Sequence, residues 1–301
     1  MSMIVSIGEI LFDIFPGYRR IGGAPFNFAY HILKMGIQVD FITRVGEDES
    51  GRDILNFMEL HGFNISNVQK DVRHETGRVI VSLDPEGNPE FNIITNVAYD
   101  FIEFNTPVSQ LLQMKPDLIY FGTLAQRTES GFETIQQILS ARAQSTRCIY
   151  DVNLRPHCYS EQTIMASLRQ CDVVKMSEEE LRILKKMHRF FDSDEDFINY
   201  ILKTYKIEMV SLTRGKKGSS LYTAANSYHQ EITSTATVAD TVGAGDAYAA
   251  VLAVGYMNHW TPERIVKASA KLAERICGIK GAIPKDAEFY KDLRDTLKES
   301  V

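Results

Sequence analysis

The sequence predicts an α/β protein in which helices cover both faces of one mostly parallel sheet. Short apolar runs of strand length alternate with amphipathic stretches of helical length, and strands that are separated by helices usually pair in parallel. The chain has 301 residues and is 44% hydrophobic, which is enough to bury a full core. Because no repeat or Pro-, Gly- or Ser-rich linker divides it, we expect one domain over residues 1–301.

The apolar runs give the expected order of strands and helices. Thr261, Pro262 and Glu263 form a sound helix start, because Thr can cap, Pro is tolerated in the first turn and Glu favours the positive end of the helix dipole. We therefore expect helices to dominate the last quarter of the chain. The expected strands are Val5–Ile10, Val39–Val45, Leu118–Phe121, Cys148–Asp151, Val173–Met176 and Met209–Thr213. The expected helices include Asn27–Met35, Asp53–His61, Phe132–Ala141 and Leu181–Met187.

Residues 71–95 interrupt this alternation. Val79–Leu83 and Phe91–Ile94 flank a turn at Pro85–Asn88, which is the pattern of a β-hairpin. A hairpin cannot bury both of its faces alone, so it must pack on something else. Two interpretations stay open: a lid that covers a substrate, or an edge hairpin without a functional role.

Composition excludes several classes of protein. Lys plus Arg number 33 against 39 Asp plus Glu, so the net charge of -6 is opposed to binding nucleic acid or an anionic membrane. The start of the chain is a short apolar run without a basic leader, which favours a buried first strand and a cytoplasmic location. The cysteines lack CxxC spacing and are expected to be reduced thiols; they are Cys148, Cys158, Cys171 and Cys277.

The segment Asp240–Asp246, with the sequence DTVGAGD, carries the strongest chemical signal. It runs into Ala247–Tyr256, whose small apolar residues predict a buried helix, so the glycines lie at a helix N-terminus. Unpaired amides and the helix dipole favour an anion there, and glycines let a phosphate approach the backbone. A carboxylate at this place would repel phosphate unless it served the chemistry. Asp246 is therefore a candidate base for an attacking hydroxyl.

Other interpretations of this segment are weaker. Asp246 could simply favour the first helical turn of a Gly-rich loop. A dinucleotide fingerprint is excluded because position 248 is Tyr where that motif needs Gly or Ala, and no GxxxxGK[ST] run occurs. A nicotinamide-dependent oxidoreductase is therefore a poor explanation of the loop.

The whole chain resembles the ribokinase-like, or PfkB-type, carbohydrate kinases. DTVGAGD resembles their second signature, and GGxxxN and RVGxDxxG elements precede it in the right order. Two further runs resemble the DxNxR and KxSxxE of fructokinases. The matching segments are Gly22–Asn27, Arg44–Gly51, Asp151–Arg155, Lys175–Glu180, Leu212–Gly218 and Asp240–Asp246. The resemblance implies a three-layer α/β/α fold with a small β lid, formed by about residues 14–21 and 71–95.

The resemblance also implies roles for individual residues. Asp246 would be the general base, while amides of Gly243, Ala244 and Gly245 would bind the transferring phosphoryl group. Sugar hydroxyls would be held by Asp13, Gly22, Gly23 and Asn27. Asp13 could instead be a turn residue before Pro16, and Asn27 could merely cap a helix.

On the phosphate side, Arg155 would grip phosphate or sugar through its planar guanidinium, unless it forms a surface ion pair. Glu180 would help to organise hydrated Mg²⁺, although Ser177 with Glu180 is also a capping box. Asp240 and residues 278–282 are candidates for a monovalent cation such as K⁺. The resemblance places the nucleotide beside Thr213, Gly215 and Gly218, although a Gly-Lys turn between two strands needs no ligand.

The sequence thus predicts a kinase that transfers the γ-phosphoryl group of ATP to a small sugar, with Mg²⁺. Fructose is the leading substrate, because GEILFDIFP, GGAPFNFA, DVNLR and KMSEEE look most like fructokinases. Ribose, ketodeoxygluconate, tagatose phosphate and nucleosides stay open, as does a regulator that binds sugar or nucleotide without turnover. The lids of relatives often form a dimer contact, so we also expect a homodimer.

Overall fold

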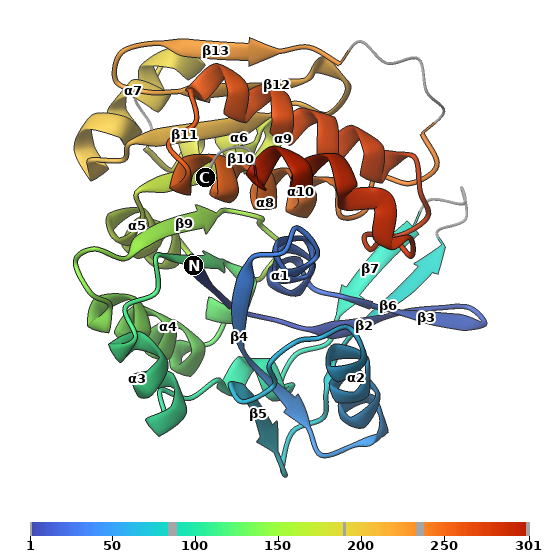
Figure 1. Ribbon diagram of the computed structural model, residues 1–301. Coiled ribbons are helices and arrows are strands. Elements are labelled where there is room, and N and C mark those ends of the chain that lie inside the picture. The colour runs from blue at the N-terminus through green and yellow to red at the C-terminus, as the bar shows by residue number, and fades with distance from the viewer. Residues whose placement is uncertain (1, 84–88, 189–190, 233–237, 299–301) are drawn as a thin grey trace.

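The computed structural model describes residues 2–83, 89–188, 191–232 and 238–298 and contains two sheets (Figure 1). The strands of the large sheet are β1 (Met3–Ile7), β4 (Gln38–Gly46), β5 (Val68–Asp71), β8 (Leu118–Gly122), β9 (Arg147–Asp151), β10 (Val173–Ser177), β11 (Met209–Thr213), β12 (Ser219–Tyr222) and β13 (Ser227–Gln230). Their spatial order is β13-β12-β11-β10-β9-β8-β1-β4-β5. Neighbours from β11 to β5 are parallel, and β12 and β13 are antiparallel additions at one edge. The predicted mostly parallel sheet is confirmed.

Helices cover both faces of the large sheet, as predicted. Successive residues of a strand point to opposite faces, so Ile4 packs with one core and Val5 with the other. The core that contains Val5 is closed by α3 (Thr106–Gln113), α4 (Glu129–Ala141), α5 (Glu161–Gln170), α6 (Glu178–His188) and α7 (Asp194–Tyr205). The core that contains Ile4 is closed by α1 (Ala24–Lys34), α2 (Glu49–Leu60), α8 (Ala244–Met257), α9 (Pro262–Cys277) and α10 (Lys291–Lys298).

The smaller sheet is built from two hairpins. Its strands are β2 (Leu11–Phe15), β3 (Tyr18–Gly22), β6 (Gly77–Leu83) and β7 (Pro89–Ile93), in the order β3-β2-β6-β7. We call these four strands the lid sheet; they stand to one side of the large sheet in Figure 1. Asp71 ends β5 and belongs to the large sheet, so the hairpin begins later than residue 71. The predicted turn at Pro85–Asn88 lies outside the described residues.

Helix starts follow the expected local chemistry. Thr261 caps α9, where its hydroxyl accepts a hydrogen bond from the amide of Arg264 at 3.3 Å. The helix predicted after DTVGAGD begins within that motif, at Ala244. All of its residues from Ala247 to Tyr256 are buried. Gly243 precedes it in the left-handed conformation with φ +79°, which a residue with a side chain rarely adopts. The glycine therefore fixes where α8 begins.

Candidate active site

The candidate site lies where the carboxyl ends of the parallel strands meet the N-terminus of α8. Asp151 ends β9 and Ser177 ends β10, and the residues that follow turn toward the same edge of the sheet. In open α/β sheets, ligands bind outside the carboxyl ends of the strands. Gly243, Ala244 and Gly245 form the first turn at the N-terminus of α8, so their backbone lies where an anion is favoured. We call these three residues the cradle.

Asp246 lies directly beyond the cradle in the first turn of α8. Its Oδ2 accepts a hydrogen bond from Nδ2 of Asn27, on α1, at 2.7 Å. Burial raises the pKa of Asp246 from 3.8 to about 6, although Lys175 and the Asn27 hydrogen bond oppose this shift. Asn27 is buried and lies inside α1. The N-cap residue of this helix is Gly23 rather than Asn27. The pair links the first and last quarters of the chain.

A cavity of about 340 Å³ lies beside Asn27. This volume suits a small ligand. Its wall combines the lid sheet with the segment that leads to the cradle. It is lined by Asp13, Phe15, Tyr18, Arg20, Ile21, Gly22, Asn27, Phe91, Ala239, Asp240, Val242, Lys280, Gly281 and Ala282.

The segment from Glu9 to Asp13 holds two acidic side chains, of which Asp13 lines this cavity. Burial raises the pKa of Asp13 to about 6, against the attraction of Arg155 and Arg20. Burial also raises the pKa of Glu9 to about 7, and its carboxylate accepts a hydrogen bond from the amide of Ala24 at 3.3 Å. Glu9 was not among the predicted site residues; its signal in the sequence was an acidic residue inside an apolar run.

Two predicted glycines lie against the segment from Glu9 to Asp13. A Cβ on Gly23, whose φ is +109°, would lie 2.5 Å from the carbonyl oxygen of Glu9, and this backbone contact excludes a side chain. A Cβ on Gly22 would lie 2.6 Å from Oδ2 of Asp13, the end of a side chain that can rotate away. Close packing therefore requires glycine at position 23, while Gly22 is explained by its place beside Asp13.

The residues predicted to contact phosphate follow β9 and β10. Arg155 is exposed, and its guanidinium donates to the carbonyl of Leu154 at 3.3 Å. Its positive charge acts to lower the pKa of Asp13 and of Asp246. The Glu180 carboxylate accepts from the amides of Leu154 at 2.8 Å and Ser177 at 2.7 Å. The Ser177 hydroxyl accepts from the amide of Glu180 at 3.2 Å, which completes the capping box.

The three residues predicted at the nucleotide lie around the β11–β12 turn. Thr213 ends β11 and Gly215 follows it with φ +53° in open space. A Cβ on Gly218 would lie 2.0 Å from the carbonyl oxygen of Gln230, on β13. This contact accounts for Gly218 without a ligand, so the alternative of a structural turn explains it.

Asp240 joins the cradle segment to residues 278–282, as the sequence suggested. Its Oδ2 accepts from the amide of Gly281 at 2.9 Å and its Oδ1 accepts from the amide of Val242 at 3.1 Å. The guanidinium of Arg20 lies 3.6 Å from Oδ2. Asp240 therefore connects the lid sheet to the loop that precedes the cradle.

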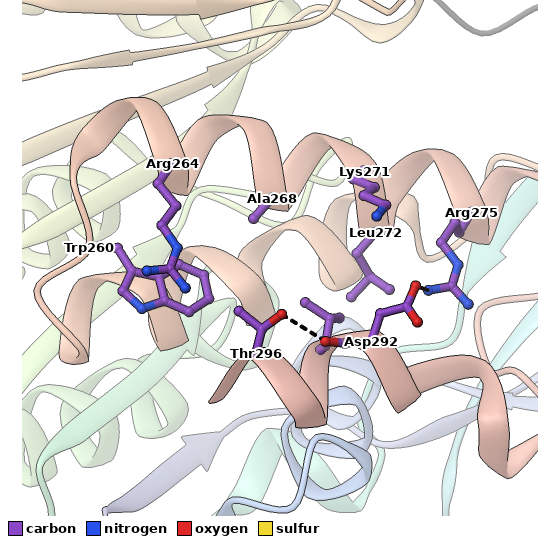
Figure 2. A pocket seen from close by; sticks show the side chains of 9 residues that line it. Trp260, Arg264, Ala268, Lys271, Leu272, Arg275, Asp292 and Thr296 are labelled. Atoms are coloured by element: carbon purple, nitrogen blue, oxygen red, sulfur yellow. Dashed lines mark hydrogen bonds and ion pairs between the residues drawn. The ribbon is translucent and has the colours of Figure 1, made fainter. Parts of the chain in front are cut away.

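A second, smaller hollow of about 140 Å³ lies between α9 and α10 and is shown in Figure 2. Arg264 stacks on Trp260 at 4.0 Å, and Arg275 lies 3.9 Å from Asp292. No glycine is among the residues that line this hollow, and its lining shares no residue with the larger cavity. It is a gap in helix packing rather than a second reaction centre.

An anion cradle, an adjacent carboxylate and a cavity of sugar size together define a phosphotransferase that acts on a sugar hydroxyl. The chain belongs to the pfkB family of carbohydrate kinases, whose family model matches residues 17–288. It is 28% identical to a fructokinase of Salmonella typhimurium over 95% of this chain and 96% of that protein. It is also 28% identical to a fructokinase of Escherichia coli, over 97% of each.

Solved structures agree with this fold. A sugar kinase from Pyrococcus horikoshii superposes with a TM-score of 0.84 at 25% identity, over 98% of this chain and 100% of that one. A fructokinase of Vibrio cholerae O395 in a form bound to fructose, ADP and calcium ion gives 0.80 at 24% identity, over 97% and 98%. Among the described residues, no helix has the length and apolar character needed to cross a membrane.

Proposed function

We propose that this kinase transfers the γ-phosphoryl group of ATP to a hydroxyl of D-fructose. The observation that carries the proposal is the Asn27–Asp246 hydrogen bond beside the 340 Å³ cavity, directly next to the cradle. Asn27 lines this cavity and binds Asp246, so a hydroxyl in the cavity would lie near the proposed base. The fructokinases of Salmonella typhimurium and Escherichia coli, which align over nearly the whole chain, support fructose as the acceptor.

Asp246 accepts the proton of the attacking hydroxyl, and Asn27 fixes the direction of its carboxylate. Cradle amides stabilise charge on the transferring phosphoryl group, and the guanidinium of Arg155 adds a positive charge. Asp13, Gly22 and Gly23 hold and shape the sugar site. The lid sheet would exclude water, which suppresses hydrolysis of ATP.

A divalent cation, Mg²⁺ in our proposal, would offset the charge of the nucleotide phosphates. Glu180 would orient it through water, which fits the preference of Mg²⁺ for retained waters and few carboxylates. Two amides occupy part of the Glu180 carboxylate and leave further lone pairs for such waters. Thr213 and Gly215 would border the nucleotide, and carbonyls near Asp240 and Gly281 are our candidates for K⁺.

One observation favours a second acceptor class. The cavity lining balances the carboxylates of Asp13 and Asp240 with two cations, Arg20, which lies 3.6 Å from Asp240, and Lys280. An anionic sugar, such as ketodeoxygluconate or tagatose phosphate, would use them. A 5-dehydro-2-deoxygluconokinase of Geobacillus kaustophilus, 26% identical over 85% of this chain, shows that aligned relatives extend beyond fructose.

The test is ADP release that depends on Mg²⁺ and ATP, measured with fructose, ribose, ketodeoxygluconate, tagatose phosphate, glucose and adenosine. We expect the highest kcat/KM with fructose and a loss of about 10²- to 10⁴-fold in kcat for Asp246→Asn. Higher kcat/KM with an anionic sugar would replace fructose and retain the mechanism. Parental turnover in Asp246→Asn, or no response to any sugar while ATP still binds, would refute the proposal and favour a non-catalytic regulator.

The proposal includes a cytoplasmic homodimer that forms through the lid sheet. Phe91 and Tyr18 are 54% and 49% exposed on this sheet, and such apolar area favours a protein contact. The four thiols are free, as expected for the cytoplasm. A monomeric mass in light scattering would contradict the dimer.

A further inference from the structure

A lysine that the proposed mechanism does not use lies beneath the cradle. Lys175 is in the interior of β10, paired in register with Asp151 of β9. Its Nζ lies 3.0 Å and 2.9 Å from the two carboxylate oxygens of Asp151, and both side chains are buried. Tyr120, on β8, donates its hydroxyl to the same carboxylate at 2.8 Å. The ammonium is thus held in one place from two strands.

Burying an ion pair is costly, and an apolar pair of similar volume often stabilises a protein equally well or better. Val173, two residues before Lys175 on the same face of β10, is fully buried and apolar, as the core of a parallel sheet requires. Packing alone therefore gives no reason for a lysine here. The direction in which its charge points provides one.

Lys175 reaches the cradle directly. A Cβ added at Gly245 would lie 3.1 Å from its Nζ, so the ammonium lies close to the backbone of the cradle. Burial opposes the charge of Lys175, but Asp151, Glu180 and Asp246 act against burial and raise its pKa.

The other polar groups around the ammonium come from several elements. Tyr120 of β8 shares its Asp151 partner, and Tyr248 of α8 also interacts electrostatically with Lys175. The charge of Asp151 acts to raise the pKa of Asp246, and the charge of Arg155 acts to lower it. Lys175 is the largest charge-based influence that keeps Asp246 ionised, so it links the phosphate-binding turn to the proposed base.

We propose that Lys175 is a positioning residue of this kinase: clamped by Asp151, it presents a fixed buried cation to the underside of the cradle and to Asp246. There it offsets the charge of the transferring phosphoryl group and keeps the Asp246 carboxylate ready to accept a proton. The inference rests on the proposed function, since it takes Asp246 as the base.

The test compares Lys175→Met, Asp151→Asn, the double variant of these two changes, and Asp246→Asn. Lys185→Met is the matched control, because Lys185 pairs with Asp194 at 2.7 Å near the end of α6, outside the site. Each variant is examined by urea unfolding and by kcat and kcat/KM from pH 5 to 9, with the acceptor that the parent uses.

We expect Lys175→Met to lower kcat about 10²-fold, as for loss of one charge-stabilising group, and to shift the acid limb of kcat/KM upward by about one pH unit. Asp151→Asn retains the ammonium and removes a negative neighbour, so its acid limb should shift downward. The double variant removes both members of the buried pair, so it should regain stability while kcat stays low. Lys185→Met should behave like the parent.

A purely structural role of Lys175 predicts different results. If Lys175 only neutralises Asp151, the double variant recovers kcat together with stability, and no acid limb moves; either result overturns the inference. If Lys175→Met does not fold, the double variant decides alone. Parental turnover in Asp246→Asn would refute the proposed base itself, whereas an inactive Asp246→Asn beside a folded, unshifted Lys175→Met would refute only the role of Lys175.

Discussion

Replacing Asp246 by Asn should make the ligand-free protein more stable while it removes activity. The pKa of Asp246 is raised from 3.8 to about 6, with burial as the main cause. Between these two values the folded protein binds more protons than the unfolded chain, so stability falls as pH rises through this window and the penalty is complete above it. This rise in the pKa corresponds to a loss of about 3 kcal/mol in the free energy of unfolding. Because the side chain is partly exposed, we expect a penalty of ~1–3 kcal/mol.

Asparagine carries no charge and can still accept the hydrogen bond from Asn27, so it avoids this penalty. We expect urea unfolding at pH 8 without ligand to show a gain of ~1–3 kcal/mol over the parent, and about half that gain at pH 5. The slope of the unfolding free energy against urea should be unchanged. A variant that is no more stable than the parent at pH 8, or whose gain does not shrink toward pH 5, would show that burial does not destabilise this carboxylate.

Two further predictions concern the cradle and the cavity. Gly243→Ala should cost more than about 2 kcal/mol in urea unfolding, because φ is +79° and the new Cβ would lie 2.2 Å from Cβ of Ala282. Gly36→Ala, at φ +85° in open space, should cost only about 1 kcal/mol, and equal costs would contradict the close contact. Arg20→Met should change stability by less than about 1 kcal/mol, because its pair with Asp240 is partly exposed, yet raise the KM for sugar about tenfold. Arg19→Met, whose parent pairs with Asp53 instead, should leave that KM unchanged.

The strands were predictable because a strand that is buried on both faces of the sheet consists almost entirely of apolar residues. The helices were predictable from the amphipathic stretches between these strands. Met209–Thr213 matches β11 at both ends. The first run was predicted through Ile10, whereas β1 ends at Ile7. Gly8, with φ +147°, turns the chain there, and the next apolar residues begin the lid sheet. The prediction therefore extended the first strand into the connection that precedes β2, which begins at Leu11.

The site was predictable where one short segment carries it, as in DTVGAGD. It was not predictable where two distant segments meet. Lys175 is one charged residue inside an apolar run, and its partner Asp151 becomes visible only through the register of β9 and β10. Asn27 is the intermediate case: its motif suggested a sugar ligand, while its hydrogen bond to Asp246 depends on how α1 packs against α8.

The position of β1 has a consequence for synthesis of the chain. This first strand lies inside the large sheet between β4 and β8, so it cannot gain both neighbours until residues 118–122 have been made. Its neighbour α1 must then wait for α8, because Asn27 meets Asp246 across 219 positions of sequence. Domains fold from the N-terminus onward as the ribosome releases them. A nascent chain can therefore build most of its sheet before residues 243–246 have been made, and so it lacks the candidate base and the cradle until synthesis is nearly complete.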